Sequence, residues 1–359
     1  MMSKPTEPDD LHVLHADDFE PQRPEWSHKQ FRRMVWKTRW KIFLNAGGVL
    51  FLIFILYHVY LTALHMYFDQ SKVRNELMRS IISVVEMHGD GLRVEKSPHQ
   101  TIEVTPFLTQ KANLKVYRLV GSSEVITGEV QAERSITGKF SYKMNSTGAY
   151  LNGNEPGPFY LPYDLVDGQP SHEDTEENSS SKRLRKIDDG HVAEISISLK
   201  NLKSPEQLMQ LLSKYDVRVT AMPIYSGEMQ EKNLSYSRAG MFDYNVPHLT
   251  LKPLYEMEDG GGRWFNYFPR EVEDQNQAQS EGTMQEQIQA MMSDLEWMTS
   301  NLSYNGVDWD QRRLAYLKKN GVQVYGAVVT GPVRELQKIT ENPEFRHVHL
   351  NRVEIWNWD

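Results

Sequence analysis

Two pairs of residues in this 359-residue sequence have types and a spacing that could hold a divalent metal ion. Asp308 and Asp310 flank one tryptophan, and two aspartates at this spacing can hold a divalent ion on the phosphates of a sugar nucleotide. His347 and His349 would point to one face of a strand, as two metal ligands do. The histidine pair has no identifiable third ligand, and Asp308 stands where a helix needs a cap and an acidic first turn. We therefore expect a helix cap at Asp308 and solvated strand histidines.

The other residue patterns that carry chemistry are missing or incomplete. The sequence has no cysteine, which excludes disulfides, thiol catalysis and thiolate zinc sites. Gly260-Gly261-Gly262 has no strand before it and no Lys-Ser/Thr after it, so it does not fit a phosphate-binding loop. A net charge of -8 gives no overall case for nucleic-acid binding. We predict no catalytic, cofactor-binding or metal-binding residues and no cofactor.

The N-terminal part of the sequence has a sharply divided charge. Six acids lie within residues 1–20, and seven Lys or Arg within residues 21–41. Residues 42–68 carry no formal charge, and as a helix residues 42–64 would be about 34 Å long, which exceeds the ~30 Å of a bilayer core. Residues 69–80 carry three Lys or Arg, so the basic bias predicts a cytoplasmic N-terminus. The length and position of the apolar run fit an uncleaved anchor better than a signal peptide.

Aromatic residues flank the apolar run, with Trp36 and Trp40 before it, as at membrane interfaces. Mixed basic and aromatic residues also occur in nucleic-acid-binding segments, an alternative that we consider weaker here. His58 and His65 would share one helical face, which suits a contact with a partner or with the interface better than a proton relay, because the run holds no acid.

The region after the apolar run is predicted to mix helices and strands. Helical spacing covers residues 71–87, period-two alternation predicts a small antiparallel unit over residues 92–151, and residues 169–186 form a polar stretch expected to be a solvated linker. Two β-α-β units follow. The first has strands at 192–199 and 217–224 around a helix opened by the capping box Ser204-Pro205-Glu206-Gln207. The second has strands at 322–330 and 347–356 around a helix opened by Gly331-Pro332.

We expect right-handed crossovers that make the two strands of each unit neighbours in one sheet. Between the units, residues 242–282 are irregular, and a helix opened by the capping box Thr283-Met284-Gln285-Glu286 carries a stripe of methionines and leucines. This stripe could be an adaptable partner groove, but packing on the sheet is favoured. A further helix over residues 308–319 should end at Asn320-Gly321. The fold class is α+β: one transmembrane helix, then an extracellular region with a small β unit and a C-terminal domain with two β-α-β units.

Four features define the layout of the sequence: the basic-aromatic approach from Phe31 to Ile42, the single span, the strand-rich outer segment and the C-terminal motif Val324-Tyr325-Gly326-Ala327-Val328-Val329-Thr330-Gly331-Pro332. This layout resembles the sigma-factor regulators of Gram-positive bacteria. These are single-pass anti-sigma proteins with paired N- and C-terminal regulator domains, of the kind that restrains the cell-envelope-stress sigma factor M. The resemblance implies a cytoplasmic tail and basic-aromatic segment (1–41), a transmembrane helix (42–66), a stalk with an N-terminal regulator region (67–160), a polar linker (161–188) and a C-terminal regulator domain (189–359).

The resemblance also implies a function, that of a membrane anti-sigma factor which is not an enzyme. It would hold an extracytoplasmic-function sigma factor at the cytoplasmic face and respond to envelope stress through its outer domain. A second small membrane protein would be a further candidate partner. Membrane lipid would be a partner, and nucleic acid would not be bound directly. The candidate partner-binding residues are Leu11, Leu14, Phe19, Asp17, Asp18, Trp36 and Trp40. Two alternatives remain: an envelope structural or assembly protein without a sigma client, and a type II anchored enzyme using the Asp308 and Asp310 pair.

Overall fold

The computed structural model describes residues 28–68, 71–95, 102–147, 157–165, 179–228, 237–239, 243–253, 256–257, 269–270 and 281–356. The chain divides into two compact units, residues 1–62 and residues 63–359.

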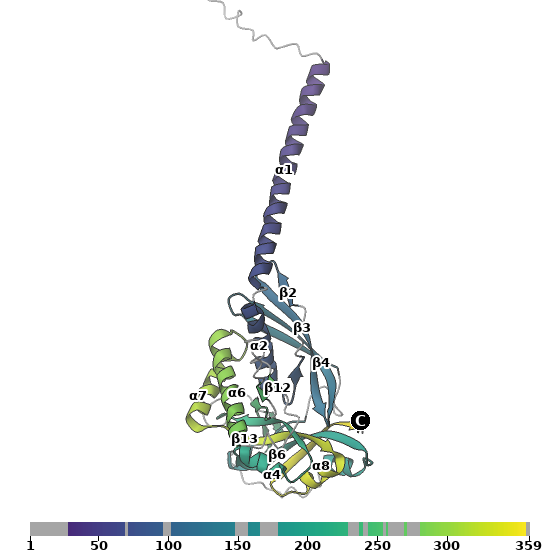
Figure 1. Cartoon of the computed structure of the whole chain (residues 1–359), viewed down its shortest axis with the longest axis vertical. Helices are drawn as coiled ribbons and strands as arrows, with labels where there is room; N and C mark the ends of the chain where they lie inside the picture. The colour runs from purple at the N-terminus through teal and green to yellow at the C-terminus, as the bar shows by residue number, and fades with distance from the viewer. Residues whose placement is uncertain are drawn as a thin grey trace, which may run out of the picture. The chain divides into compact units, whose positions relative to one another are not determined.

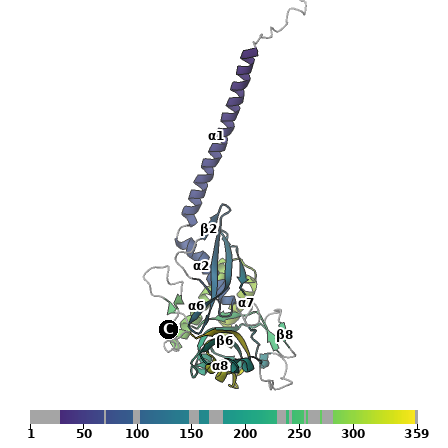
Figure 2. The ribbon, with the colours of Figure 1, turned by 90° about the vertical axis from the view of Figure 1, so that its right-hand side faces the viewer.

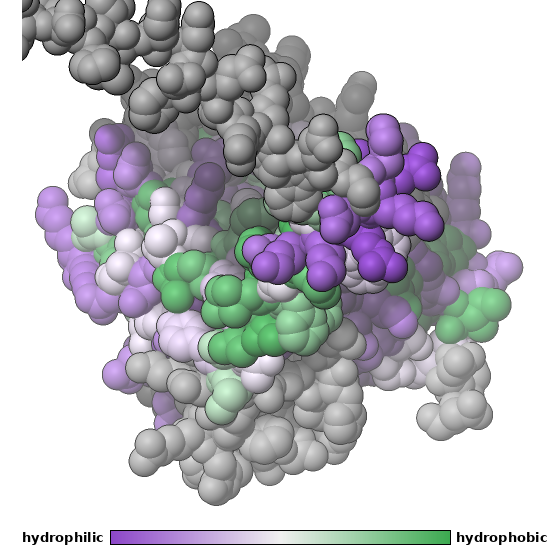
Figure 3. All heavy atoms as spheres, turned by 90° about the horizontal axis from the view of Figure 1, so that it is seen from above, coloured by the Kyte–Doolittle hydropathy of each residue, from purple (hydrophilic) through white to green (hydrophobic). Residues whose placement is uncertain are grey.

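The first unit consists, in its described part, of most of helix α1 (His28–Phe68). This is the one helix among the described residues that is long and apolar enough to cross a membrane, and none of its most apolar stretch is buried (Figure 1). Large apolar side chains from Val49 to Leu56 are all exposed to solvent. Hydrophobic side chains also lie uncovered on the face seen in Figure 3. The helix predicted for residues 42–64 is confirmed, and it begins earlier because no proline or glycine interrupts the basic-aromatic segment before it.

The second unit begins with helix α2 (Ser71–His88) and an antiparallel sheet. The strands are β1 (Arg93–Val94), β2 (Ile102–Thr105), β3 (Thr109–Val120), β4 (Ser123–Ser135) and β5 (Phe140–Ser146), paired in the order β1-β3-β4-β5 with β2 also on β3. Burial alternates along β3, as expected for a sheet with one solvated face. Leu77 and Ile81 of α2 share a core with Leu114 and Val116 of β3, and Figure 2 shows the helix alongside the sheet. Both the helix and the small antiparallel unit predicted for this region are confirmed.

The second sheet has the order β10-β7-β13-β6-β14, and every neighbouring pair is antiparallel. Its strands are β6 (His191–Lys203), β7 (Arg218–Tyr225), β10 (Leu249–Leu251), β13 (Gln323–Pro332) and β14 (Phe345–Ile355). The elements of the two β-α-β units are present, but the prediction that each unit's strands are neighbours is wrong. Strand β13 lies between β6 and β7, and β6 lies between β13 and β14. The two β-α-β units therefore interleave within one sheet, which is the split β-α-β arrangement of ferredoxin-like folds.

Helices α4 (Pro205–Leu212) and α8 (Val333–Thr340) connect the strands of the two units. Ser204 caps α4 as predicted, because its side chain accepts from the backbone N–H of Gln207 and the Gln207 side chain accepts from the backbone N–H of Ser204. Leu208 of α4 and Leu336 of α8 are fully buried in the core that also holds Ile195 and Ile197 of β6.

The insertion between β7 and β13 contains short strands and two helices, α6 (Glu281–Asn301) and α7 (Val307–Asn320). The short strands besides β10 are β8 (Ser237–Ala239), β9 (Asp243–Asn245), β11 (Glu256–Met257) and β12 (Pro269–Arg270). The apolar face of α6 is buried, with Leu295 and Met298 fully covered, so it packs in the core and is not an open partner groove. Helix α6 begins at Glu281, before the predicted capping box at Thr283, and the Gly260 triplet lies outside the described residues.

The segment predicted to be a solvated linker is structured where it is described. Ser179–Arg185 form helix α3, and Tyr163–Leu165 form the short 3-10 helix η2. Leu184 of α3 and Leu161 before η2 have no exposed surface. The prediction of a solvated linker is therefore wrong for residues 179–185, because a few apolar residues in a polar stretch are enough to dock it on the sheet. The other residues of the predicted linker that fall between 166 and 178 lie outside the described parts.

Candidate functional site

The residues predicted to bind a partner fall into two groups. Leu11, Leu14, Phe19, Asp17 and Asp18 lie outside the described residues. Trp36 and Trp40 lie one turn apart on α1, with 65% and 49% of their surfaces exposed and ring centroids 5.7 Å apart. The helix therefore presents these two rings on one face, and the prediction that they contact a partner stays a prediction.

The two carboxylates of the Asp308 and Asp310 pair face different surroundings. Asp308 is exposed and Asp310 is fully buried. The position before α7 that would hold its cap is Gly306, with no side-chain hydrogen bond, so the prediction that Asp308 caps this helix is wrong. Gly306 adopts a φ of 99°, in the left-handed region that suits glycine, and the helix begins at Val307, one residue before the predicted start. Within the described residues no cluster of three or more His, Asp or Glu is placed to hold a metal ion.

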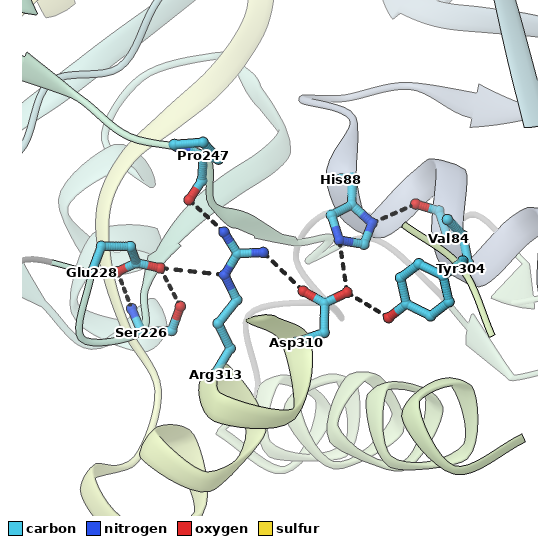
Figure 4. A network of polar contacts seen from close by, with 8 residues as sticks. All are labelled: Val84, His88, Ser226, Glu228, Pro247, Tyr304, Asp310 and Arg313. Atoms are coloured by element: carbon cyan, nitrogen blue, oxygen red, sulfur yellow. Dashed lines mark hydrogen bonds and ion pairs between the residues drawn. The ribbon is translucent and has the colours of Figure 1, made fainter. Parts of the chain in front are cut away.

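Asp310 belongs to a buried network that joins α2 to α7 (Figure 4). Its carboxylate lies 3.0 Å from His88 Nε2 at the end of α2, accepts from the Tyr304 hydroxyl at 2.5 Å and accepts from Arg313 Nη1 at 2.8 Å. Burial alone would raise the pKa of Asp310, but the contacts with His88, Tyr304 and Arg313 hold this pKa below its usual value. Burial and the neighbouring Asp310 charge raise the pKa of the Tyr304 hydroxyl. Asp310 is therefore an ionised carboxylate inside the protein.

Arg313 extends this network toward the sheet. Its Nη2 donates to the carbonyl oxygen of Pro247 at 2.6 Å, and its Nε lies 3.7 Å from Glu228 Oε1. Glu228 in turn accepts from the backbone N–H of Ser226, at the end of β7, at 2.8 Å. One arginine thus connects α7, the chain before β10 and the chain after β7, and a planar guanidinium suits such multiple contacts.

A second buried pair lies just beyond the end of α2. His248 Nε2 lies 2.8 Å from Asp90 Oδ1, and the Thr250 hydroxyl donates to the same oxygen at 3.0 Å. The other ring nitrogen of His248 lies 3.0 Å from the carbonyl oxygen of Val246. Burial alone would lower the pKa of His248, but Asp90 outweighs it and raises this pKa, while His248 holds the pKa of Asp90 below its usual value. The pair is therefore stabilised as an imidazolium and a carboxylate.

Two further buried ion pairs connect the same parts of the second unit. Lys252 Nζ donates to Glu86 of α2 at 2.8 Å, and Glu86 also accepts from the backbone N–H of Val94. Arg118 of β3 lies 2.7 Å from Glu194 of β6, and each of these two side chains is 1% exposed. Both pairs join the α2 and β1–β5 layer to the second sheet. Breaking one partner of a buried pair is costly, so these contacts specify how the two layers fit together.

His347 and His349 do not form the solvated pair that was expected. Both are half-buried beside Tyr160, whose ring centroid lies 4.6 Å from that of His347 and 6.1 Å from that of His349. Burial, together with the neighbouring His347, lowers the pKa of His349. His347 has a φ of 47° and sits at a register shift of β14, so it departs from regular strand geometry.

Comparison with known proteins identifies the class of the C-terminal part. Residues 184–352, from the end of α3 through nearly all of β14, match the family model described as sigma factor regulator C-terminal. The C-terminal part of the chain, a little under half of its length, is therefore similar to sigma factor regulator C-terminal domains. The chain is also 50% identical over 46 residues to the probable anti-sigma-M factor YhdL of Bacillus subtilis (strain 168). That match covers 13% of this chain and 13% of YhdL, so the chain spans only a small part of the curated relative. No solved structure matches the chain.

The buried network was not among the residues that the sequence analysis singled out, apart from Asp310. Its members come from the end of α2, the chain around β10 and the start of α7. The His88–Asp310 and Asp90–His248 contacts each join residues that are more than 150 positions apart in the sequence. The one available signal was the run of ionisable residues Glu86, His88 and Asp90 at the end of an apolar helix.

Proposed function

We propose that this protein is a membrane-anchored anti-sigma factor that holds an extracytoplasmic-function sigma factor at the cytoplasmic face of the membrane. The sigma factor regulator C-terminal domain, on a chain with one exposed apolar helix of membrane-spanning length, carries the proposal. The short identity to the probable anti-sigma-M factor YhdL supports the same class of partner. The protein is proposed not to be an enzyme.

The proposed topology places the N-terminus in the cytoplasm and residues after α1 outside. Seven Lys or Arg precede the apolar run within residues 21–41, which favours retention of that side in the cytoplasm. A sigma factor could then reach only the tail and the start of α1. Leu11, Leu14 and Phe19 would supply apolar contacts, Asp17 and Asp18 would steer association, and Trp36 and Trp40 would extend the surface along α1.

The outer domain is proposed to report envelope state through α2. Only residues 69 and 70 separate α1 from α2, and the far end of α2 carries three buried ionisable contacts, through Glu86, His88 and Asp90. Any rearrangement of the second sheet that breaks these contacts would therefore release α2. A second small membrane protein on the outer side would act on the same contacts.

The test replaces Leu11, Leu14 and Phe19 by alanine in the full chain and measures transcription from the sigma factor's promoters. We expect increased transcription at normal membrane abundance, since each well-buried apolar anchor contributes about 1 to 3 kcal/mol to an interface. The matched control is Ile126→Ala, which removes an exposed apolar side chain of the outer sheet.

Co-purification from membranes, with the tail as bait, identifies the partner directly. Recovery of a sigma factor with the native tail and its loss with the triple variant supports the proposal. Unchanged repression after both the triple substitution and a replacement of Trp36 and Trp40 by alanine would contradict direct sigma binding, and would favour an envelope assembly role without a sigma client.

A further inference from the structure

Two turns of the first sheet meet at one of its ends and expose apolar side chains. Phe107 and Leu108 lie in the turn between β2 and β3, and Ile136 lies in the turn between β4 and β5. The backbone N–H of Ile136 donates to the carbonyl oxygen of Leu108 at 3.1 Å, which ties the two turns together. Phe107 is 87% exposed, Ile136 48% and Leu108 36%. We call these three residues the hairpin tip.

The backbone of the tip is held in an uncommon conformation. Leu108 has a φ of 59°, in the left-handed region that branched side chains rarely adopt. Such strain persists where the surrounding structure enforces it, here through the turn and the bond to Ile136. The tip is therefore a fixed projection of the sheet, and its apolar side chains point away from the core.

The tip lies at the end of α2 where the chain arrives from α1. Arg134, two residues before Ile136, forms an ion pair at 2.9 Å with Glu76, which lies about 8 Å along the helix axis from Ser71. The opposite end of α2 contacts β1 through Glu86 and α7 through His88. Since α1 ends at Phe68, only residues 69 and 70 separate it from the start of α2, so the tip and the end of the anchor belong to the same end of the outer domain.

The charges around the tip suit a lipid surface. Residues 104–110 and 135–138 contain no charged side chain, and three of the four charged residues that directly flank them are basic: Lys111, Arg134 and Lys139, against Glu103. Exposed apolar residues beside a basic residue are typical of segments that enter the interface of a bilayer with anionic headgroups. No acid lies within the two turns to repel such headgroups.

We propose that the hairpin tip inserts Phe107, Leu108 and Ile136 into the outer surface of the lipid bilayer. This second contact with the membrane, which rests on the proposed anchoring by α1, fixes the outer domain against the bilayer. Helix α2 is then held between the membrane at its first turn and the buried ion pairs at its last turn.

The experiment uses the full chain, whose lack of cysteine allows single labelling sites. Three variants, Phe107→Cys, Ile136→Cys and Ile126→Cys, are labelled with an environment-sensitive fluorophore and reconstituted in vesicles of phosphatidylglycerol and phosphatidylethanolamine. Ile126 is the matched control, because it is 54% exposed on the same sheet but far from the tip. At the usual rise per residue of a β-strand, the stretch of β4 from Ile126 to the turn at Ile136 spans about 30 Å. A fourth variant, Phe54→Cys in α1, reports the anchor itself.

We expect blue-shifted emission at positions 107 and 136 that falls when spin-labelled lipid is added, with neither effect at position 126. A label at position 54 that is quenched while the labels at 107 and 136 stay aqueous would overturn the tip insertion and leave the anchor intact. A label at position 54 that is not quenched would overturn both the tip insertion and the anchoring by α1. Blue-shifted emission at 107 without quenching by lipid would mean that protein covers the tip, and would also overturn the proposal.

Discussion

Loss of Asp310 should be costly to the stability of the second unit. The side chain of Asp310 is 1% exposed and is shared by His88, Tyr304 and Arg313. Removing it leaves the guanidinium of Arg313, which is 4% exposed, without its closest carboxylate. Asp310→Ala should therefore lower the free energy of unfolding by about 3 to 5 kcal/mol, as for other broken buried pairs.

Chemical denaturation of the detergent-solubilised full chain, followed by tryptophan fluorescence, measures this loss. The matched variant is Asp308→Ala, which removes an exposed carboxylate from the first turn of the same helix and should cost about 0.3 to 1 kcal/mol. Equal costs for the two variants would contradict the assignment of Asp310 to the buried network.

The Asp90–His248 pair predicts a pH dependence of stability. The raised pKa of His248 means that its contribution is fully present below its unfolded value of about 6.5 and is lost as the pH rises through the folded value. The lowered pKa of Asp90 means that its contribution is present above about 3.9 and is lost as the pH falls through the folded value. The pair should therefore stabilise the fold most between about pH 4 and 6.5.

The measurement is a double-mutant cycle of Asp90→Asn and His248→Gln, with unfolding followed from within that pH range to well above the folded pKa of His248. Other groups act on the pair, namely Glu228 on His248 and Arg118 on Asp90, and they are unchanged in every arm of the cycle. The coupling energy between the two variants should decrease above the folded pKa of His248. A coupling energy that does not vary with pH would be inconsistent with an ionised pair.

At the scale of the elements, the start of α4 offers a local test. Ser204 and Gln207 satisfy each other's backbone N–H groups, with hydrogen bonds of 3.0 and 3.2 Å. Ser204→Ala removes one of these bonds and should cost about 0.5 to 2 kcal/mol of unfolding free energy, whereas Ser204→Asp keeps a capping oxygen and should cost much less. Thermal unfolding of the three proteins compares them directly.

The elements were predictable from the sequence where local signals decide them. The periodicity of α2, the alternation of β3 and β4 and the capping box of α4 all appear in the structure as expected. The order of the second sheet was not predictable in this way. Strand β13 has Tyr325, Val328 and Val329 fully buried, which marks a central strand, but the pattern does not say which strands flank it.

The candidate site was predictable only in part, for a related reason. Asp308 and Asp310 are two residues apart, so on a helix they point in nearly opposite directions, and burial of one excludes joint binding of an ion. Whether either is buried depends on His88, which lies 222 residues earlier in the chain. Partners of buried charges are set by tertiary packing, and no spacing rule for neighbouring residues can supply them.

At the scale of the whole molecule, the proposed topology has a direct test. Cysteines introduced singly at Ser3 and at Ile126, in a chain with no cysteine, are exposed to a thiol reagent that cannot cross membranes. We expect labelling at position 126, which is exposed on the first sheet away from the hairpin tip, and protection at position 3 until the membrane is permeabilised. Labelling at Ser3 in intact cells would show that the orientation is the opposite one. The tail would then lie outside the cytoplasm, where no sigma factor could reach it.

The position of β13 at the centre of the second sheet has a consequence for the order of synthesis. Gly326 pairs with Ser198, and Val324 pairs with Ile224, so both neighbours of β13 precede it by about 100 residues or more. Such pairings between distant residues form late and slowly. On the proposed topology, β6 and β7 emerge from the translocation channel without the strand that joins them, and the sheet closes only after residue 332 has crossed. The second sheet therefore stays incomplete, and open to chaperones and proteases of the envelope, for most of the passage of its strands across the membrane.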